Sequence, residues 1–132
     1  MKILFFSLIS ILTIQCKQVD ANETVLLNMQ SETQEPIIKV LPKESFKAAI
    51  SGNTVQLIDV RTPEEYIDGH IEGALNINVQ DQKFAEQISK LDKTKTVYIY
   101  SRSGSRSQMA ASQMKTLGFK SIIDLKGGYM NY

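Results

Sequence analysis

The fold is decided by the stretch Thr96-Val97-Tyr98-Ile99-Tyr100-Ser101-Arg102-Ser103-Gly104-Ser105-Arg106. Its first part is β-branched and aromatic, which is typical of a buried strand. The part after Tyr100 is polar around a central glycine, which is typical of a tight turn. A helical pattern follows at once, with apolar residues at Ala110, Met114 and Leu117. The stretch therefore predicts a strand that passes through a short polar loop directly into a helix.

Three more short apolar runs share the composition of this strand, over residues 37–41, 55–60 and 122–125. Segments with apolar residues at helical spacing alternate with the runs, over residues 42–50, 82–91 and 105–117. This alternation predicts an α/β protein with a parallel sheet, helices on both faces, and strands mostly buried on both sides. Ligands of such proteins bind outside the carboxyl ends of the strands.

A further helix start is marked by Thr62-Pro63-Glu64-Glu65. Threonine is a good N-cap, proline suits the first helical position, and a glutamate at the third helical position can bond back to the N-cap. These residues predict a capping box at the start of a helix that follows the strand over residues 55–60.

The composition bounds the possible functions. The chain has 132 residues, 42% of them apolar, which suits one domain with its own core. The net charge of +1 gives no reason to expect nucleic acid or an anionic membrane surface as a partner. A single cysteine excludes an internal disulfide and a zinc site built on several thiolates. No nucleotide-binding, flavin or metal motif is present in the sequence, so we expect no cofactor and no metal.

Residues 1–15 read as an export signal. The apolar run over residues 3–14 follows Lys2 and is too short to cross a bilayer, which takes about 20 residues. Cys16 comes next, which resembles a bacterial lipoprotein signal and predicts an exported protein anchored to the membrane by a lipid on Cys16. Cleavage after Ala21, which would leave a soluble periplasmic protein, stays open as the alternative.

Residues 16–35 are polar and lack glycine and proline, so we interpret them as a tether with little structure of its own. The apolar patch Val25-Leu26-Leu27 leaves open the alternative that this segment docks on the domain. The globular domain is predicted over residues 36–132.

The loop after Tyr100 can bind an anion. Backbone N–H groups around Gly104 can converge on a ligand at the start of the helix. The arginines of the loop add charge and forked donors suited to a sulfur or phosphorus oxyanion. The candidate anion-binding residues are Arg102, Ser103, Gly104, Ser105 and Arg106. A polar turn that merely connects strand and helix is the alternative.

Residues 36–132 resemble the rhodanese family of sulfurtransferases. The motifs that carry the resemblance are Leu57–Tyr66, Gly69–Ile77, Tyr100–Ser107, Leu117–Phe119 and Leu125–Tyr129, in the family's order and spacing. The resemblance implies a three-layer α/β fold with a five-stranded parallel sheet and an active site in the loop over residues 101–106. It also implies that Asp59, Arg61 and Glu65 support the loop through charge pairs, and that His70 is a structural residue at a turn. Acid–base roles for these four residues are the alternative.

The first loop position decides the function. The family normally has a cysteine there, which carries sulfur as a persulfide, whereas this chain has Ser101. A hydroxyl is neither a good nucleophile near neutral pH nor able to hold a second sulfur. Cys16 carries the one thiol of the chain. This thiol is lost in both interpretations of the signal, either by lipidation or by cleavage with the signal. We therefore expect a domain of the cell envelope that transfers no sulfur and binds an anion or an unidentified protein partner. A working sulfurtransferase is the alternative, and a phosphatase is disfavoured by the missing thiolate.

Overall fold

The structure is a computed structural model that describes residues 35–52 and 54–132. The export signal, Cys16, Ala21 and the tether up to residue 34 lie outside the described residues. In the described part of the chain, no helix is both long enough and apolar enough to cross a membrane.

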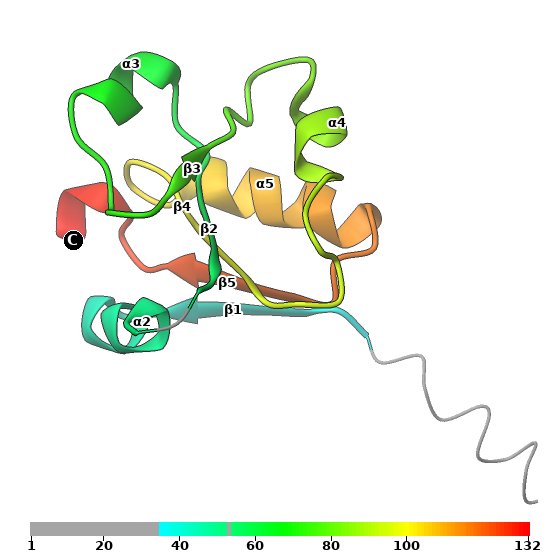
Figure 1. Cartoon of the computed structure of the whole chain (residues 1–132), viewed down its shortest axis with the longest axis horizontal. Coiled ribbons are helices and arrows are strands. Elements are labelled where there is room, and N and C mark those ends of the chain that lie inside the picture. Colours follow the sequence, from blue (N-terminus) through cyan, green and yellow to red (C-terminus); the bar gives the residue numbers. More distant parts are fainter. Residues whose placement is uncertain (1–34, 53) are drawn as a thin grey trace, which may run out of the picture. The chain divides into compact units, whose positions relative to one another are not determined.

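Five parallel strands form one sheet, in the order β1-β5-β4-β2-β3 (Figure 1). The strands are β1 (Ile37–Leu41), β2 (Gln56–Asp59), β3 (Leu75–Asn76), β4 (Val97–Tyr100) and β5 (Ser121–Leu125). The helices are α2 (Lys43–Ile50), α3 (Pro63–Ile67), α4 (Phe84–Ile88) and α5 (Ser105–Thr116), followed by the short 3₁₀ helix η1 (Tyr129–Asn131). The predicted α/β fold with a five-stranded parallel sheet is confirmed.

Each face of the sheet has its own hydrophobic core. On one face, Phe84 and Ile88 of α4 and Ala110 and Met114 of α5 pack against apolar side chains of the strands. On the other face, Phe46 of α2 packs with strand residues, and with side chains from α3 and η1. The molecule is therefore a three-layer structure with helices on both faces, because each strand interior presents apolar residues to both sides.

The prediction that the strands are buried on both faces is wrong for β1. Ile37, Ile38 and Val40 are 43%, 42% and 51% exposed. The reason is position, because β1 lies at the edge of the sheet and, among the described residues, pairs with β5 alone. An apolar run therefore predicted a strand correctly without predicting where in the sheet it lies.

Two other elements differ from the sequence prediction. The helix predicted over residues 82–91 is shortened to α4, because tight turns precede it and Lys90 N–H and Leu91 N–H bond three residues back at its end. The strand β3 has two residues, too few to give an alternating pattern.

The predicted capping box of α3 is confirmed, since Thr62 Oγ1 accepts from Glu65 N–H and Glu65 Oε2 accepts from Thr62 N–H.

The topology places the polar loop at the carboxyl end of the central strand of the sheet. β4 lies between β5 and β2, and Asp59 at the end of β2 is in register with Tyr100 at the end of β4. The residues that follow β2 and β4 therefore emerge side by side at the same edge of the sheet. Arg61, Glu65 and the loop after Tyr100 are brought together by this arrangement.

Candidate functional site

The loop between β4 and α5 turns sharply at Gly104. Gly104 has φ of 108°, a left-handed conformation that side-chain-bearing residues rarely adopt. Its N–H bonds within the loop, and the helix begins at the next residue, Ser105. The first N–H groups of a helix have no partner inside it. No hydrogen bond within the described residues uses the N–H groups of Arg102, Ser103, Ser105 or Arg106, so these groups are available to an anion.

Ser101 closes the base of the loop. Its side-chain oxygen accepts a hydrogen bond from Gly104 N–H at 3.1 Å and lies 3.2 Å from the hydroxyl of Ser107. Ser107 in turn donates to the carbonyl of Gly104 at 2.9 Å. Ser101 is 1% exposed, and within the described residues none of these bonds involves a histidine or a carboxylate. The hydroxyl is therefore held as a structural group and has no general base beside it.

The carbonyl side of the loop is covered by the C-terminal segment. Tyr129 N–H donates to the carbonyl of Ser101 at 2.8 Å, and Met130 N–H donates to that of Arg102 at 3.0 Å. Gly128 makes this approach possible, because a Cβ there would lie 2.5 Å from both carbonyl oxygens. With its carbonyls bonded to this segment, the loop keeps its free N–H groups for a ligand.

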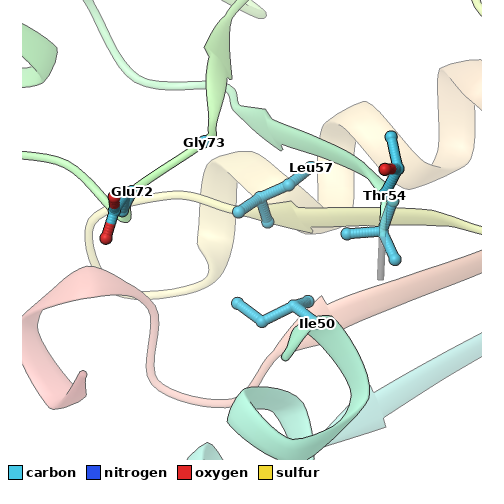
Figure 2. Close-up of a pocket in the computed structure, with 6 residues that line it drawn as sticks. Ile50, Thr54, Leu57, Glu72 and Gly73 are labelled. Carbon is cyan, nitrogen blue, oxygen red and sulfur yellow. The ribbon is translucent and has the colours of Figure 1, made fainter. Parts of the chain in front are cut away.

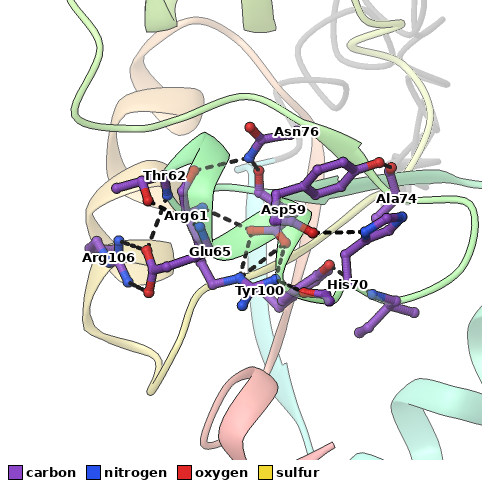
Figure 3. A network of polar contacts seen from close by, with 12 residues as sticks. Asp59, Arg61, Thr62, Glu65, His70, Ala74, Asn76, Tyr100 and Arg106 are labelled. Carbon is purple, nitrogen blue, oxygen red and sulfur yellow. Dashed lines mark hydrogen bonds and ion pairs between the residues drawn. The ribbon is translucent and has the colours of Figure 1, made fainter.

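Arg106 is bound to Glu65 by two hydrogen bonds, of 2.6 Å from Nη1 and 2.8 Å from Nη2 (Figure 3). These bonds, with help from the N–H of Thr62, lower the pKa of Glu65 to about 2. The pair joins the start of α5 to the first turn of α3. Because its guanidinium is committed to Glu65, Arg106 offers an anion its backbone N–H, whereas the exposed side chain of Arg102 is in no ion pair among the described residues.

Asp59 and Arg61 form a second, buried ion pair. Arg61 Nη2 lies 2.6 Å from Asp59 Oδ2 and 2.6 Å from the carbonyl of Gly69, and both side chains of the pair are almost fully buried (Figure 3). The guanidinium also lies 4.2 Å from the ring centre of Tyr129. This pair ties the end of β2 to the turn after α3 and to the C-terminal segment.

His70 lies apart from the loop. Its ring stacks on Tyr66 with centres 3.8 Å apart, and its Nδ1 is 2.9 Å from the carbonyl of Tyr66. It is exposed and makes no hydrogen bond to the loop. The structure therefore brings Asp59, Arg61, Glu65 and the loop together and leaves His70 outside this group.

Asp124 is a buried polar residue that the sequence reasoning did not single out. It is 2% exposed, and its Oδ1 has no hydrogen-bond partner among the described residues. Burial raises the pKa of Asp124 to about 6, although Ser107 and the N–H of Leu125 oppose the rise. Through Ser107, Asp124 is linked to the base of the loop. A lone aspartate inside the apolar run of β5 was the signal that could have found it.

A pocket of about 260 Å³ opens beside the loop. It is lined by residues from the end of β2, from α3 and its following turn, from the loop and from the C-terminal segment: Arg61, Glu65, Asp68, Gly69, Arg102, Tyr129 and Met130. Four of these side chains are ionic, two of each sign.

A second hollow of about 210 Å³ has a different character (Figure 2). Ile50, Thr54 and Leu57 border it on one side and Glu72 and Gly73 on the other. It contains no basic residue and no residue of the loop. Of these two hollows, the pocket beside the loop is the one lined by basic residues. Across the described part of the chain, no group of His, Cys, Asp and Glu has an arrangement that could hold a metal ion.

The described fold and loop define a class: a parallel α/β domain whose candidate site is a strand–loop–helix turn. The family model of the rhodanese-like domain matches residues 42–132. The chain belongs to the rhodanese-like domain family.

Relatives and solved structures agree with this family. The uncharacterized protein YqhL of Bacillus subtilis is 38% identical over 99 residues, which cover 75% of each chain. Thiosulfate sulfurtransferase 18 of Arabidopsis thaliana is 30% identical over 112 residues, covering 76% of this chain and 81% of that one. The crystal structure of a rhodanese-related protein from Thermoplasma volcanium is 26% identical and superposes with a TM-score of 0.61, covering 70% of this chain and 87% of that one. Some members of the family are therefore named sulfurtransferases, and others carry no named activity.

Proposed function

We propose that this chain is a rhodanese-like domain without sulfurtransferase activity, which binds a small sulfur or phosphorus oxyanion, or an anionic group of a partner protein, at the loop over residues 101–106. The observation that carries the proposal is the identity and hydrogen bonding of residue 101. The residue at the base of the loop is a serine whose hydroxyl is buried and hydrogen-bonded to Gly104 N–H and Ser107.

Sulfur transfer in this family requires a thiolate, which the hydroxyl of Ser101 cannot replace. A thiolate attacks the outer sulfur of a donor such as thiosulfate, sulfite leaves with the electron pair of the broken S–S bond, and a persulfide remains. A serine hydroxyl is not ionised near neutral pH, and among the described residues that of Ser101 is hydrogen-bonded to no histidine or carboxylate. It also cannot form a stable equivalent of the persulfide. The same loop keeps its free N–H groups and the cation of Arg102, which suit binding without reaction.

A sulfur-transfer assay tests the proposal. Purified protein is incubated with thiosulfate and cyanide in thiol-free buffer, and thiocyanate is measured against a control without protein. We expect no thiocyanate above the control. Formation of thiocyanate by the unaltered chain would refute the absence of activity.

The variant Ser101→Cys tests whether the loop alone can support the chemistry. We expect thiosulfate to add one sulfur atom to this variant, visible by intact mass, because the free N–H groups of the loop can stabilise the negative charge of a persulfide. Ser107→Cys is the matched control, because it places a thiol beside the base of the loop and off the family's sulfur-carrying position. Absence of the added sulfur in Ser101→Cys would mean that the anion-binding frame itself is lost.

A second candidate function is a working thiosulfate-type sulfurtransferase. It is favoured by the name of the relative from Arabidopsis thaliana. It would require a sulfur carrier other than Ser101, and the same assay with thiocyanate as the product decides between the two.

We also propose that the domain acts at the bacterial cell envelope, anchored by a lipid on Cys16. The support is the apolar run that precedes Cys16 in the sequence. A lipoprotein should take up labelled fatty acid when expressed in a bacterium and remain with the membrane fraction, and Cys16→Ser should abolish both. A soluble periplasmic product that begins after Ala21 would contradict the lipid anchor and leave export intact.

A further inference from the structure

We propose that the pocket beside the loop takes a small ligand that carries an oxyanion at one end and an ammonium group at the other. The inference rests on the proposed function, because the oxyanion would be held by the loop. It adds the second charge of the ligand and therefore its chemical class.

Two of the four ionic side chains in the pocket are already neutralised within the protein. Arg61 is paired with Asp59 at 2.6 Å and bonded to the carbonyl of Gly69. Glu65 accepts two hydrogen bonds from Arg106. Neither pair has charge left for a ligand without losing bonds that join parts of the fold.

The other two ionic side chains, Arg102 and Asp68, are exposed and form no ion pair among the described residues. They have opposite charges and line the same pocket. Asp68 also caps the carboxyl end of α3, where the partial negative charge of the helix disfavours a carboxylate. The carboxylate of Asp68 therefore does not stabilise α3. A cationic group of a ligand would explain why an acidic residue lies at this position.

The pocket borders the loop at Arg102. Arg102 is the second loop residue and forms one wall, and Glu65 forms another while it holds Arg106, the last loop residue. A ligand in the pocket can therefore reach the loop with one end. Tyr129 supplies a hydroxyl that makes no hydrogen bond within the described residues, and Met130, which is 70% exposed, supplies an apolar surface.

The size of the pocket limits the ligand. Pockets for drug-sized molecules measure roughly 300–1,000 Å³, and this one measures about 260 Å³. A short chain between the two charges fits this space. The class is that of small aminoalkyl sulfonates, thiosulfonates and phosphonates, of which 2-aminoethanesulfonate is a simple probe.

Calorimetric titration of the full chain tests the inference with two matched probes. 2-Aminoethanesulfonate carries both charges, and 1-propanesulfonate has the same length and the same anion, with a methyl group in place of the ammonium group. We expect the first to bind about two- to five-fold more tightly, as one exposed ion pair would give. In Asp68→Asn the two probes should bind equally well. Glu64→Gln is the control, because Glu64 lies on the same helix, is exposed and does not line the pocket.

The outcomes separate the inference from the proposed function. Equal binding of the two probes by the unaltered chain, or a preference that survives in Asp68→Asn, overturns the inference and leaves the anion site intact. Binding of neither probe, together with no binding of sulfate or thiosulfate, overturns the proposed anion site itself. Loss of the preference in Glu64→Gln as well as in Asp68→Asn would show a general effect of charge and would also overturn the inference.

Discussion

Asp124 shows how a single buried residue can make stability depend on pH. An aspartate normally has a pKa of 3.8, and burial raises the pKa of Asp124 to about 6. The folded state therefore holds a proton at Asp124 that the unfolded state has already released between these pH values. It follows that the contribution of Asp124 to stability is greatest below about pH 4 and is lost as the pH rises to about 6.

We predict that Asp124→Asn removes this pH dependence. Two units of pKa correspond to about 3 kcal/mol, so the free energy of unfolding attributable to this carboxylate should fall by up to about that amount between pH 4 and pH 6. In Asp124→Asn the fall should be absent, and the variant should be at least as stable as the original chain at pH 7.5. Urea unfolding at a series of pH values measures this. A variant with the same pH profile as the original chain would contradict the assignment.

Gly128 is the residue on which the contact between the loop and the C-terminal segment depends. It has φ of 63°, and a Cβ would lie 2.5 Å from the carbonyl oxygens of Ser101 and Arg102. We predict that Gly128→Ala lowers the free energy of unfolding by about 3 to 4 kcal/mol, because backbone must move as well as adopt a strained conformation.

Gly73→Ala is the matched control for this prediction. Gly73 has φ of 80° and nothing within 4 Å of the position of a Cβ. The control should therefore lose only the cost of the left-handed conformation, about 1 to 2 kcal/mol. Equal losses in the two variants, measured by urea unfolding, would mean that the close approach at Gly128 carries no energy of its own.

At the scale of the elements, α3 and α5 are joined by Glu65 and Arg106. The pKa of Glu65 is about 2, below its usual value of 4.5. The stabilisation by this carboxylate is therefore present above about pH 4.5 and is lost as the pH falls towards 2. Both side chains are less than a third exposed, so solvent reduces the strength of the pair without abolishing it.

We predict that Glu65→Gln costs about 1 to 2 kcal/mol of unfolding free energy at pH 7 and weakens any anion binding at the loop. The loss should shrink below pH 4, where the carboxylate of the original chain is protonated in the unfolded state. Glu64→Gln, one residue earlier and exposed, should change the free energy of unfolding by less than about 0.5 kcal/mol. A cost for Glu65→Gln that stays constant from pH 7 to pH 2.5 would contradict the role of the ion pair.

The sequence predicted the elements in proportion to how much local chemistry marks them. Four strands, the capping box at Thr62 and the loop at Gly104 were all recognisable, because each depends on residues that lie next to one another. The two-residue strand β3 was not recognisable, since its pairing with β2 defines it. The true length of α4 was not recognisable either, because turn bonds three residues back replace helical bonds at both of its ends, where the apolar spacing continues. The edge position of β1 depends on the order of strands in the sheet, which local patterns do not contain.

Some features of the candidate site could likewise be predicted from the sequence, and others could not. Its loop was visible as a motif, and the resemblance to a family supplied the role of the supporting charges. The commitment of the Arg106 side chain to Glu65, the cover provided by Tyr129 and the burial of Asp124 involve residues far apart in the chain. Contacts of this kind follow from the packing of elements, so they became visible only in three dimensions.

At the scale of the whole molecule, one sheet separates two hydrophobic cores. Phe46 is fully buried on one face, and Met114 is fully buried on the other. The strands between them contribute alternate side chains to both cores, as Leu57 and Ile58 of β2 do. Neither core can therefore be lost without exposing the strands that hold the other.

We predict that the domain unfolds as one cooperative unit whichever core is weakened. Phe46→Ala should cost about 3 to 5 kcal/mol and Met114→Ala about 2 to 5 kcal/mol, because each leaves a cavity in a packed core. For each variant, far-UV circular dichroism and tyrosine fluorescence should report the same midpoint in urea, shifted below that of the original chain. Two separate midpoints in either variant would show that the two faces of the sheet unfold independently. The loop is supported from both faces, so its stability would then be limited to that of the less stable face.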